Sequence, residues 1–223
     1  MINLLQIDTL SHSTTASNGI SFFDLLKLGG WVMIPLMLLF VITIFVFFER
    51  LIAIRKASNI DSNFMNIIRD HIISGNVTAA RSFAKNTNNP VARIIDKGIQ
   101  RIGKPIENIE RSMENVGKLE IYGLEKNLSI LSLSAGIAPL LGFLGTIIGM
   151  FELFYSLATG GDFTIQTMAN GIYTKVITSA TGLIIGLLAY VAYNFLTTQV
   201  DKTAYKMESS SAEFLDILQE PTR

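Results

Sequence analysis

The composition of this 223-residue chain is typical of a membrane protein. Hydrophobic residues make up 49% of it and charged residues 16%, with a mean hydropathy of +0.43. Soluble domains carry about 25% charged residues. Basic and acidic residues both number 18, so the net charge is zero and offers no basic field for binding nucleic acid.

Residues suited to catalysis or metal binding are scarce. The chain has no cysteine, which excludes disulfides, thiolate metal sites and cysteine nucleophiles. Its two histidines, His12 and His71, lie in different segments and in no spacing typical of metal ligands. We therefore expect no metal, no cofactor and no enzymatic activity, since no catalytic groups converge in the sequence.

The first 29 residues are expected to lie outside the membrane. Within them, SFFDLLKLGG places Ser21 and Asp24 in a capping-box pattern beside crowded phenylalanines and leucines. This pattern predicts a short amphipathic helix lying on the outer face of the bilayer.

Three uncharged stretches are long enough to cross a bilayer. They are 30–48, 127–151 and 176–200, and the core of the first, 31–48, has Thr43 as its only polar residue. A helix of 18 to 25 residues is about 27 to 38 Å long, and the hydrocarbon layer is about 30 Å thick. The sequence therefore predicts three transmembrane helices.

The basic residues predict how these helices are oriented. Segment 50–126 holds 13 of the 18 lysines and arginines, and the tail holds Lys202, Lys206 and Arg223. Only Lys27 and Lys175 remain for the other side. Because cytoplasmic loops retain positive charge, we expect the N-terminus to lie outside and the C-terminus inside. Segment 152–175 is then a short outer loop.

The cytoplasmic parts, 49–126 and 201–223, are expected to be helical. Gly75, Pro90, Gly103 and Pro105 divide the first part into helices near 61–74, 76–87 and 90–102. No strong breaker follows Pro105, so 106–151 is predicted to form one helix about 70 Å long. The third span has no stop signal after Val200 and continues into the tail as an apolar stripe: Ala204, Met207, Ser211, Phe214 and Leu218. The predicted fold is all-α, with long helices extending from the membrane into a cytoplasmic helical domain.

The second and third spans are rich in small residues. The second contains Gly142, Gly145 and Gly149, and the third contains Gly182 and Gly186. Glycines four residues apart let helix backbones approach closely within lipid, so we expect these spans to pack against other helices, including those of further copies. Pro139, in the middle of the second span, leaves the Ala135 carbonyl without its helical donor and is interpreted as a packing kink.

Hydroxyl side chains in these spans have two interpretations. They could line a water-filled lumen, which needs several hydroxyls on a common side. Thr174, Thr178 and Thr181 share one helical face, and Thr146 and Ser179 would face a lumen only if neighbouring spans present them together. The candidate lumen residues are Thr146, Ser179, Thr178 and Thr181. Alternatively, each hydroxyl donates to the carbonyl three or four residues back in its own helix and serves no transport role. The sequence leaves both possibilities open.

Two segments resemble a known family. AGIAPLLGFLGTIIGM (135–150) and ANGIYTKVITSATGLIIGLLAY (169–190) are similar to the ExbB/TolQ/MotA proton-channel subunits, most of all to the ExbB branch. The resemblance implies that Thr146 and Ser179 line a lumen. Two positions depart from the family pattern: Thr174 stands where a glutamate is common, and Leu188 stands near a common proline.

The resemblance also implies partners and a location. It predicts a homo-oligomeric ring, a pentamer, in the bacterial inner membrane, working with an ExbD-like one-span subunit and a TonB-like protein. Such a motor converts proton-motive force into work for outer-membrane transport. A TolQ-like role in envelope maintenance, or a structural scaffold without ion flux, are the alternatives. The three spans contain no aspartate, glutamate, histidine, lysine or arginine. We therefore expect the titrating carboxylate to come from the partner.

The orientation can be tested with single cysteines, since the chain has none of its own. Gly75→Cys should be protected from an impermeant thiol reagent in intact cells, whereas Asp162→Cys should be labelled, because the basic residues hold the 49–126 segment inside. Labelling of the first and protection of the second would reverse the topology.

Overall fold

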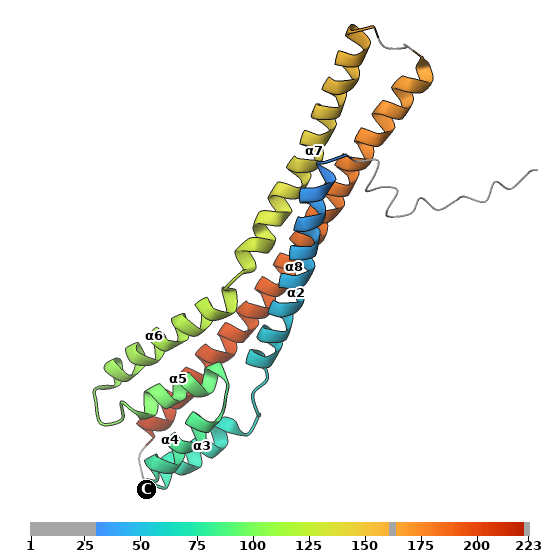
Figure 1. Cartoon of the computed structure of the whole chain (residues 1–223). Coiled ribbons are helices and arrows are strands. Elements are labelled where there is room, and N and C mark those ends of the chain that lie inside the picture. Colours follow the sequence, from blue (N-terminus) through green and yellow to red (C-terminus); the bar gives the residue numbers. More distant parts are fainter. Residues whose placement is uncertain (1–29, 161–163, 221–223) are drawn as a thin grey trace, which may run out of the picture.

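A computed structural model describes residues 30–160 and 164–220 and shows a long helical rod (Figure 1). Within these ranges every regular element is a helix, as predicted. The helices are α2 (Met33–Ser58), α3 (Phe64–Ile73), α4 (Val77–Asn86), α5 (Pro90–Ile99), α6 (Ile106–Glu125), α7 (Leu128–Ala158) and α8 (Ile165–Gln219). The amphipathic helix predicted around Ser21 lies outside the described residues.

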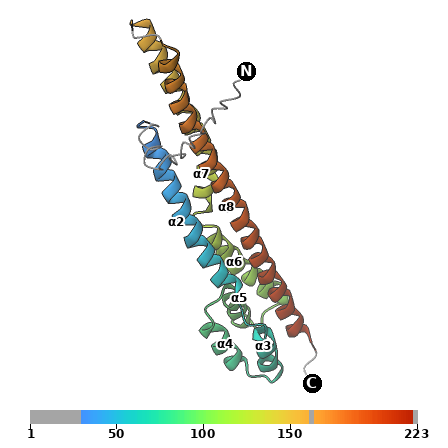
Figure 2. The ribbon, with the colours of Figure 1, turned by 90° about the vertical axis from the view of Figure 1, so that its right-hand side faces the viewer.

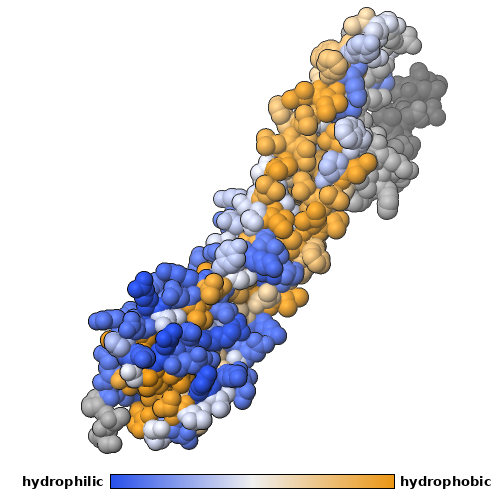
Figure 3. All heavy atoms as spheres, turned by 60° about the vertical axis from the view of Figure 1, so that its left-hand side comes forward, coloured by the Kyte–Doolittle hydropathy of each residue, from blue (hydrophilic) through white to orange (hydrophobic). Residues whose placement is uncertain are grey.

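Three of these helices are long and apolar enough to cross a membrane, which confirms the predicted number of spans. They are α2, α7 and α8, and Figure 3 shows apolar side chains gathered over the half of the rod that they form. Glu49 at one end of this section is hydrogen-bonded to Asn127, and a Cβ added to Gly145 would lie 3.3 Å from Val32 at the other end. The two levels are about 27 Å apart at 1.5 Å per residue, close to the thickness of a hydrocarbon layer.

The ends of α7 and α8 project beyond α2. Because Val32 is level with Gly145, the 146–158 part of α7, about 20 Å long, continues past the start of α2. Figures 1 and 2 show this hairpin of α7 and α8 standing clear of α2.

The prediction of one unbroken helix over 106–151 was wrong. The chain leaves helical geometry at Lys126 and Asn127, and Asn127 adopts a left-handed φ of 66° before α7 begins. Asparagine tolerates this conformation better than most residues, because its short polar side chain can hydrogen-bond locally. Figure 1 shows α6 turning away from the line of α7 at this point, so α6 can pack on α5 and α8.

Glu49 and Arg50 of α2 hold this break in place. The Arg50 guanidinium pairs with the Glu49 carboxylate and also donates to the Gly123 carbonyl, 3.3 Å away, in the last turn of α6. The hydrogen bond from Arg50 is the main reason that the pKa of Glu49 lies below its usual value, and a bond from Asn127 adds to it. One residue pair of α2, at the end of its uncharged section, thus contacts both sides of the break.

The third span and the tail form one continuous helix, as predicted. α8 runs for 55 residues and lies alongside α2 and then α5 and α6 (Figure 2). Of the predicted stripe, Met207 and Phe214 are fully buried, and the other three members are partly buried.

Helices α3 to α6 and the C-terminal part of α8 share a core of their own. The predicted helices near 61–74, 76–87 and 90–102 correspond to α3, α4 and α5, and Gly75 and Gly103 take the positive φ that ends two of them. Their apolar faces enclose a cluster with α6 and α8, which includes Phe64, Ile68, Ile94, Ile95, Met113, Met207 and Phe214. A Cβ on Gly98 would lie 2.6 Å from both Met113 and Phe214, so three helices meet at this glycine.

Asn89 joins the end of α2 to the start of α5. Its side-chain amide donates to the carbonyls of Ala57 (2.9 Å) and Asn59 (3.1 Å), and its side-chain oxygen accepts from the Val91 N–H. It is 3% exposed, so these bonds replace water that could not reach the backbone groups. Asn89 therefore both caps α5 and satisfies carbonyls left free where α2 ends.

Replacing Asn89 should separate these two roles. Asn89→Asp keeps the capping oxygen but loses both donors and turns a carboxylate toward two carbonyls, so we expect it to be at least as destabilising as Asn89→Ala. Each should cost about 1 to 3 kcal/mol, the usual penalty for leaving buried groups unpaired. Thermal unfolding of the purified chain, followed by circular dichroism, measures the loss.

Asn76 provides the matched control. It caps α4 by accepting from the Ala79 N–H and is exposed, so Asn76→Asp should leave the unfolding temperature unchanged. If Asn89→Asp were as harmless as Asn76→Asp, the link to α2 would contribute nothing.

Candidate functional site

α7 and α8 approach each other most closely where glycine faces glycine. A Cβ added to Gly182 would lie 2.8 Å from the Cα of Gly142 and 2.5 Å from the Ala138 carbonyl oxygen. One added to Gly142 would lie 3.1 Å from the Cα of Gly182 and from two carbonyl oxygens of α8. A side chain at Gly182 would force the α7 backbone to shift, and one at Gly142 would be tight against the α8 backbone, so the two backbones are in direct contact.

A second close approach involves Pro139. A Cβ on Gly186 would lie 2.6 Å from the Pro139 ring and 3.0 Å from the Ala135 carbonyl oxygen. This carbonyl is the one that loses its helical donor to the proline. Gly186 therefore makes room for the ring as α8 passes over it.

All five glycines expected to pack helices face the other helix of the same chain. Gly142, Gly145 and Gly149 of α7 meet α8, and Gly182 and Gly186 of α8 meet α7. The glycines therefore allow close packing of α7 and α8 within one copy. This packing accounts for them without any contact between copies.

α2 covers one side of the α7 and α8 pair. Val32 lies beside Gly145, and Met33 and Leu36 pack with Ala138 of α7 and Ile185 of α8. On α7, Gly145 is turned about 60° from Gly142 toward α2, and Thr146 is turned about 40° the opposite way, at 100° per residue. Thr146 is thus on the side of α7 that α2 leaves open.

Ser179 lies on the same open side. The contact of Gly186 with Pro139, and that of Thr178 with Gly145 near Val32, fix the rotation of α8. Ser179 is about 20° from Gly186 around α8, away from α2. The structure therefore brings Thr146 and Ser179, both partly buried, to one face of the α7 and α8 pair.

The other two hydroxyls predicted to line a lumen are placed differently. Thr178 is 1% exposed, with its methyl group against Gly145, so the chain's own helices enclose it. Thr181 is about 200° from Ser179 around α8, and its hydroxyl donates to the Ile177 carbonyl at 2.9 Å. Within one copy, Thr178 and Thr181 therefore lie away from the open face, and a lumen role for these two residues stays a prediction.

Thr146 also makes a local bond. Its hydroxyl donates to the Phe143 carbonyl at 2.6 Å, the arrangement expected of an ordinary threonine in a helix. A hydroxyl that donates in this way keeps its lone pairs free to accept a hydrogen bond from a group outside the chain. Thr146 can therefore still serve as an acceptor on the open face.

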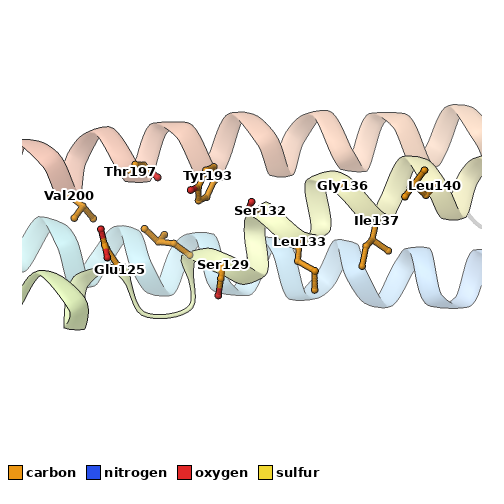
Figure 4. Close-up of a pocket in the computed structure, with 11 residues that line it drawn as sticks. Glu125, Ser129, Ser132, Leu133, Gly136, Ile137, Leu140, Tyr193, Thr197 and Val200 are labelled. Carbon is orange, nitrogen blue, oxygen red and sulfur yellow. The ribbon is translucent and has the colours of Figure 1, made fainter.

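A groove of about 720 Å³ continues the open face toward α6. We call it the inner groove; it contains four hydroxyl residues, Ser129, Ser132, Tyr193 and Thr197, and a carboxylate at one end, Glu125. Figure 4 shows Ser132, Tyr193 and Thr197 between α7 and α8. The Thr197 hydroxyl is buried and has no hydrogen-bond partner among the described residues. The groove is not apparent in the sequence, because its lining comes from two stretches, 125–140 and 193–200, that are at least 53 positions apart.

An ion pair closes the opposite end of the α7 and α8 contact. The Lys175 ammonium lies 3.5 Å from the Glu152 carboxylate, and the Lys175 stem packs directly over Gly149. The Lys175 side chain is 22% exposed and that of Glu152 is 65% exposed. A side chain at position 149 would displace the lysine stem, so Gly149 makes room for this cation. The sequence placed both charges at the end of their spans but gave no sign that they pair.

Comparison with known proteins agrees with this architecture. Residues 86–209, more than half of the chain, match the model of the MotA/TolQ/ExbB proton channel family. The chain is 38% identical over 88 residues to biopolymer transport protein exbB1 of Vibrio cholerae, covering 39% of either protein. It is 31% identical over 113 residues to the Tol-Pal system protein TolQ of Haemophilus influenzae, covering 51% of this chain and 50% of that one.

A longer alignment joins the chain to an archaeal protein. It is 27% identical over 161 residues to a protein of Methanothermobacter thermautotrophicus named as a homolog of biopolymer transport protein ExbB, covering 72% of this chain and 57% of that one. The chain thus spans about 39% to 57% of the length of these relatives.

The glycine contact can be tested with a matched pair of alanines. Gly182→Ala places a methyl group against the α7 backbone, and overpacking of this kind typically costs about 1 to 3 kcal/mol. Gly136→Ala, in the neighbouring helix, meets nothing within 4 Å and should be neutral or slightly stabilising. Thermal unfolding in mild detergent compares them; equal unfolding temperatures would show that α7 and α8 do not approach as described.

Proposed function

The chain belongs to the MotA/TolQ/ExbB proton channel family, and on that basis we propose that it is the channel-forming subunit of a proton-driven motor in the bacterial inner membrane. The N-terminus would lie outside and α3 to α6 in the cytoplasm. Copies would assemble into a ring, a pentamer, around an ExbD-like one-span subunit, and a TonB-like protein would carry the work to the outer membrane.

The observation that supports this proposal is the pairing of hydroxyls on an uncharged face. Thr146 and Ser179 lie on the side of α7 and α8 that α2 does not cover, and the uncharged spans contain no aspartate, glutamate, histidine, lysine or arginine. If the open faces of several copies surround a lumen, hydroxyls line it. A scaffold without ion flux would need no such lining.

Proton transfer then requires a carrier from a partner. Hydroxyls can accept and donate hydrogen bonds, but at neutral pH they neither release their own proton nor bind a second one. An ionisable side chain within a bilayer is costly, by at least about 2.5 kcal/mol for a charged residue, and is kept where it has a function. We propose that a carboxylate on the one-span partner alternates between charged and neutral forms as it faces Thr146 and Ser179.

A TolQ-like role is the second candidate. The alignment with the Haemophilus influenzae TolQ covers a larger share of this chain than that with the Vibrio cholerae ExbB, at lower identity. Both roles use the same lumen chemistry. Binding of a TonB-like protein is expected for the ExbB-like role alone, so a pull-down with the TonB-like protein from the same genome would separate them.

Proton flux in liposomes tests the channel itself. Under a pH gradient the chain alone should be proton-tight, and addition of the one-span partner with its carboxylate intact should give flux. Replacing both hydroxyls, Thr146→Val and Ser179→Val, should reduce this flux by about tenfold or more, because a hydrogen bond to a charged group contributes about 1.5 to 3 kcal/mol.

Thr198→Val is the control for this experiment. Thr198 is exposed, faces away from the α7 contact and donates only to its own helix, so its flux should match that of the unchanged chain. Full flux in the double valine variant would contradict a lumen role for Thr146 and Ser179. Strong flux through the chain alone would contradict the need for a partner carboxylate.

A further inference from the structure

A pocket of about 350 Å³ lies between α2 and α8, at the level where their uncharged sections end. We call it the inner-face pocket. It is separate from the inner groove, because it opens between α2 and α8 and shares no residue with the groove. Its lining is Leu51, Ile54, Arg55, Ser58, Asn59, Phe195, Gln199 and Lys206.

The pocket changes character with depth. Arg55 follows Glu49, and Lys206 follows Val200, by six residues each, so both cations are about 9 Å beyond the ends of the uncharged spans. Phe195, 44% exposed, lies on the membrane side of the pocket. One end of the pocket is therefore apolar and at the depth of acyl chains, and the other is basic and at the depth of lipid headgroups.

The basic end is prepared for an anion. Arg55 is exposed, and no hydrogen bond or ion pair involves it among the described residues. The Lys206 ammonium donates to the carbonyl and the hydroxyl of Ser58, at 3.0 and 3.1 Å, which fixes its position while leaving a third N–H free. No carboxylate lines the pocket, so nothing within it neutralises the two cations.

The donors suit a phosphate group. A guanidinium presents two parallel N–H groups that match two phosphate oxygens, and an ammonium beside it adds charge. The side-chain amides of Asn59 and Gln199 provide further donors at the same pocket. Basic pockets between membrane helices on the cytoplasmic side are a recurrent means of binding anionic lipid headgroups.

We propose that the inner-face pocket binds one anionic phospholipid, with its phosphate between Arg55 and Lys206 and an acyl chain along Leu51 and Phe195. The apolar end favours a lipid over a free phosphate ion, which would leave Phe195 uncovered. Because the lipid contacts both α2 and α8, it stabilises their packing at the membrane surface. Neither proton flux nor the number of copies in a ring affects this prediction.

Lipid-dependent stability of the full chain tests the proposal. In mild detergent, dioleoyl phosphatidylglycerol should raise the unfolding temperature by several degrees and remain bound in native mass spectrometry. Dioleoyl phosphatidylcholine, which has the same chains but no net charge, and inorganic phosphate should do neither. Stabilisation by phosphate alone would indicate a free anion site, and equal stabilisation by both lipids would exclude headgroup recognition; either result overturns the proposal.

Variants distinguish this pocket from general attraction to a basic surface. Arg55→Gln should weaken retention of phosphatidylglycerol about fivefold, because one basic residue near an anionic surface contributes about that factor. Lys202→Gln removes a nearby exposed cation that does not line the pocket and should change retention little. Arg55 makes no ion pair with the described residues, so its loss should not impair folding. Equal effects of the two variants would overturn the proposal in favour of diffuse attraction.

Discussion

The direct contact of Gly142 with Gly182 determines the arrangement of the membrane-spanning section. Two backbones at this separation cannot rotate about their axes without driving side chains into the opposite helix. The contact therefore fixes which face of each helix meets α2 and which remains open. Thr146 and Ser179 lie on the same side of the helix pair because of this contact. Pro139 fits against α8 because Gly186, which has no side chain, lies opposite it.

α8 connects two regions that are packed by different means. In the membrane section, small residues bring its backbone against α7, since lipid provides no hydrophobic drive for helix association. Toward its C-terminal end, Met207 and Phe214 are buried in an apolar cluster with α3 to α6, as in a soluble domain. Because α8 is one helix through both regions, the position of this cluster is tied to the α7 contact, while the break at Asn127 allows α6 to take its own direction.

Charged side chains concentrate at the boundaries between these regions. Glu49 and Arg50 meet the α6 and α7 break at one end of the membrane section, and Lys175 pairs with Glu152 at the other. Between them the uncharged sections of the helices carry no aspartate, glutamate, histidine, lysine or arginine. In the proposed motor this division leaves the chain to shape and line a path, and leaves proton storage to a partner, since a charge within the bilayer needs compensation that these helices do not provide.

The sequence alone determined the number of membrane helices, the boundaries of α3 to α5 to within a few residues, and the unbroken course of α8, because each depends on local hydrophobicity or on a local breaker. It did not determine the break at Asn127, since asparagine adopts a left-handed φ only where its surroundings stabilise that conformation. Here the Asn127 side chain donates to the Glu49 carboxylate, and Arg50 donates to the Gly123 carbonyl in the last turn of α6. The tertiary structure also decided which hydroxyls share a face. Spacing grouped Thr178 with Thr181, but the face that stays open depends on where α2 packs, and α2 is more than a hundred residues away in the chain.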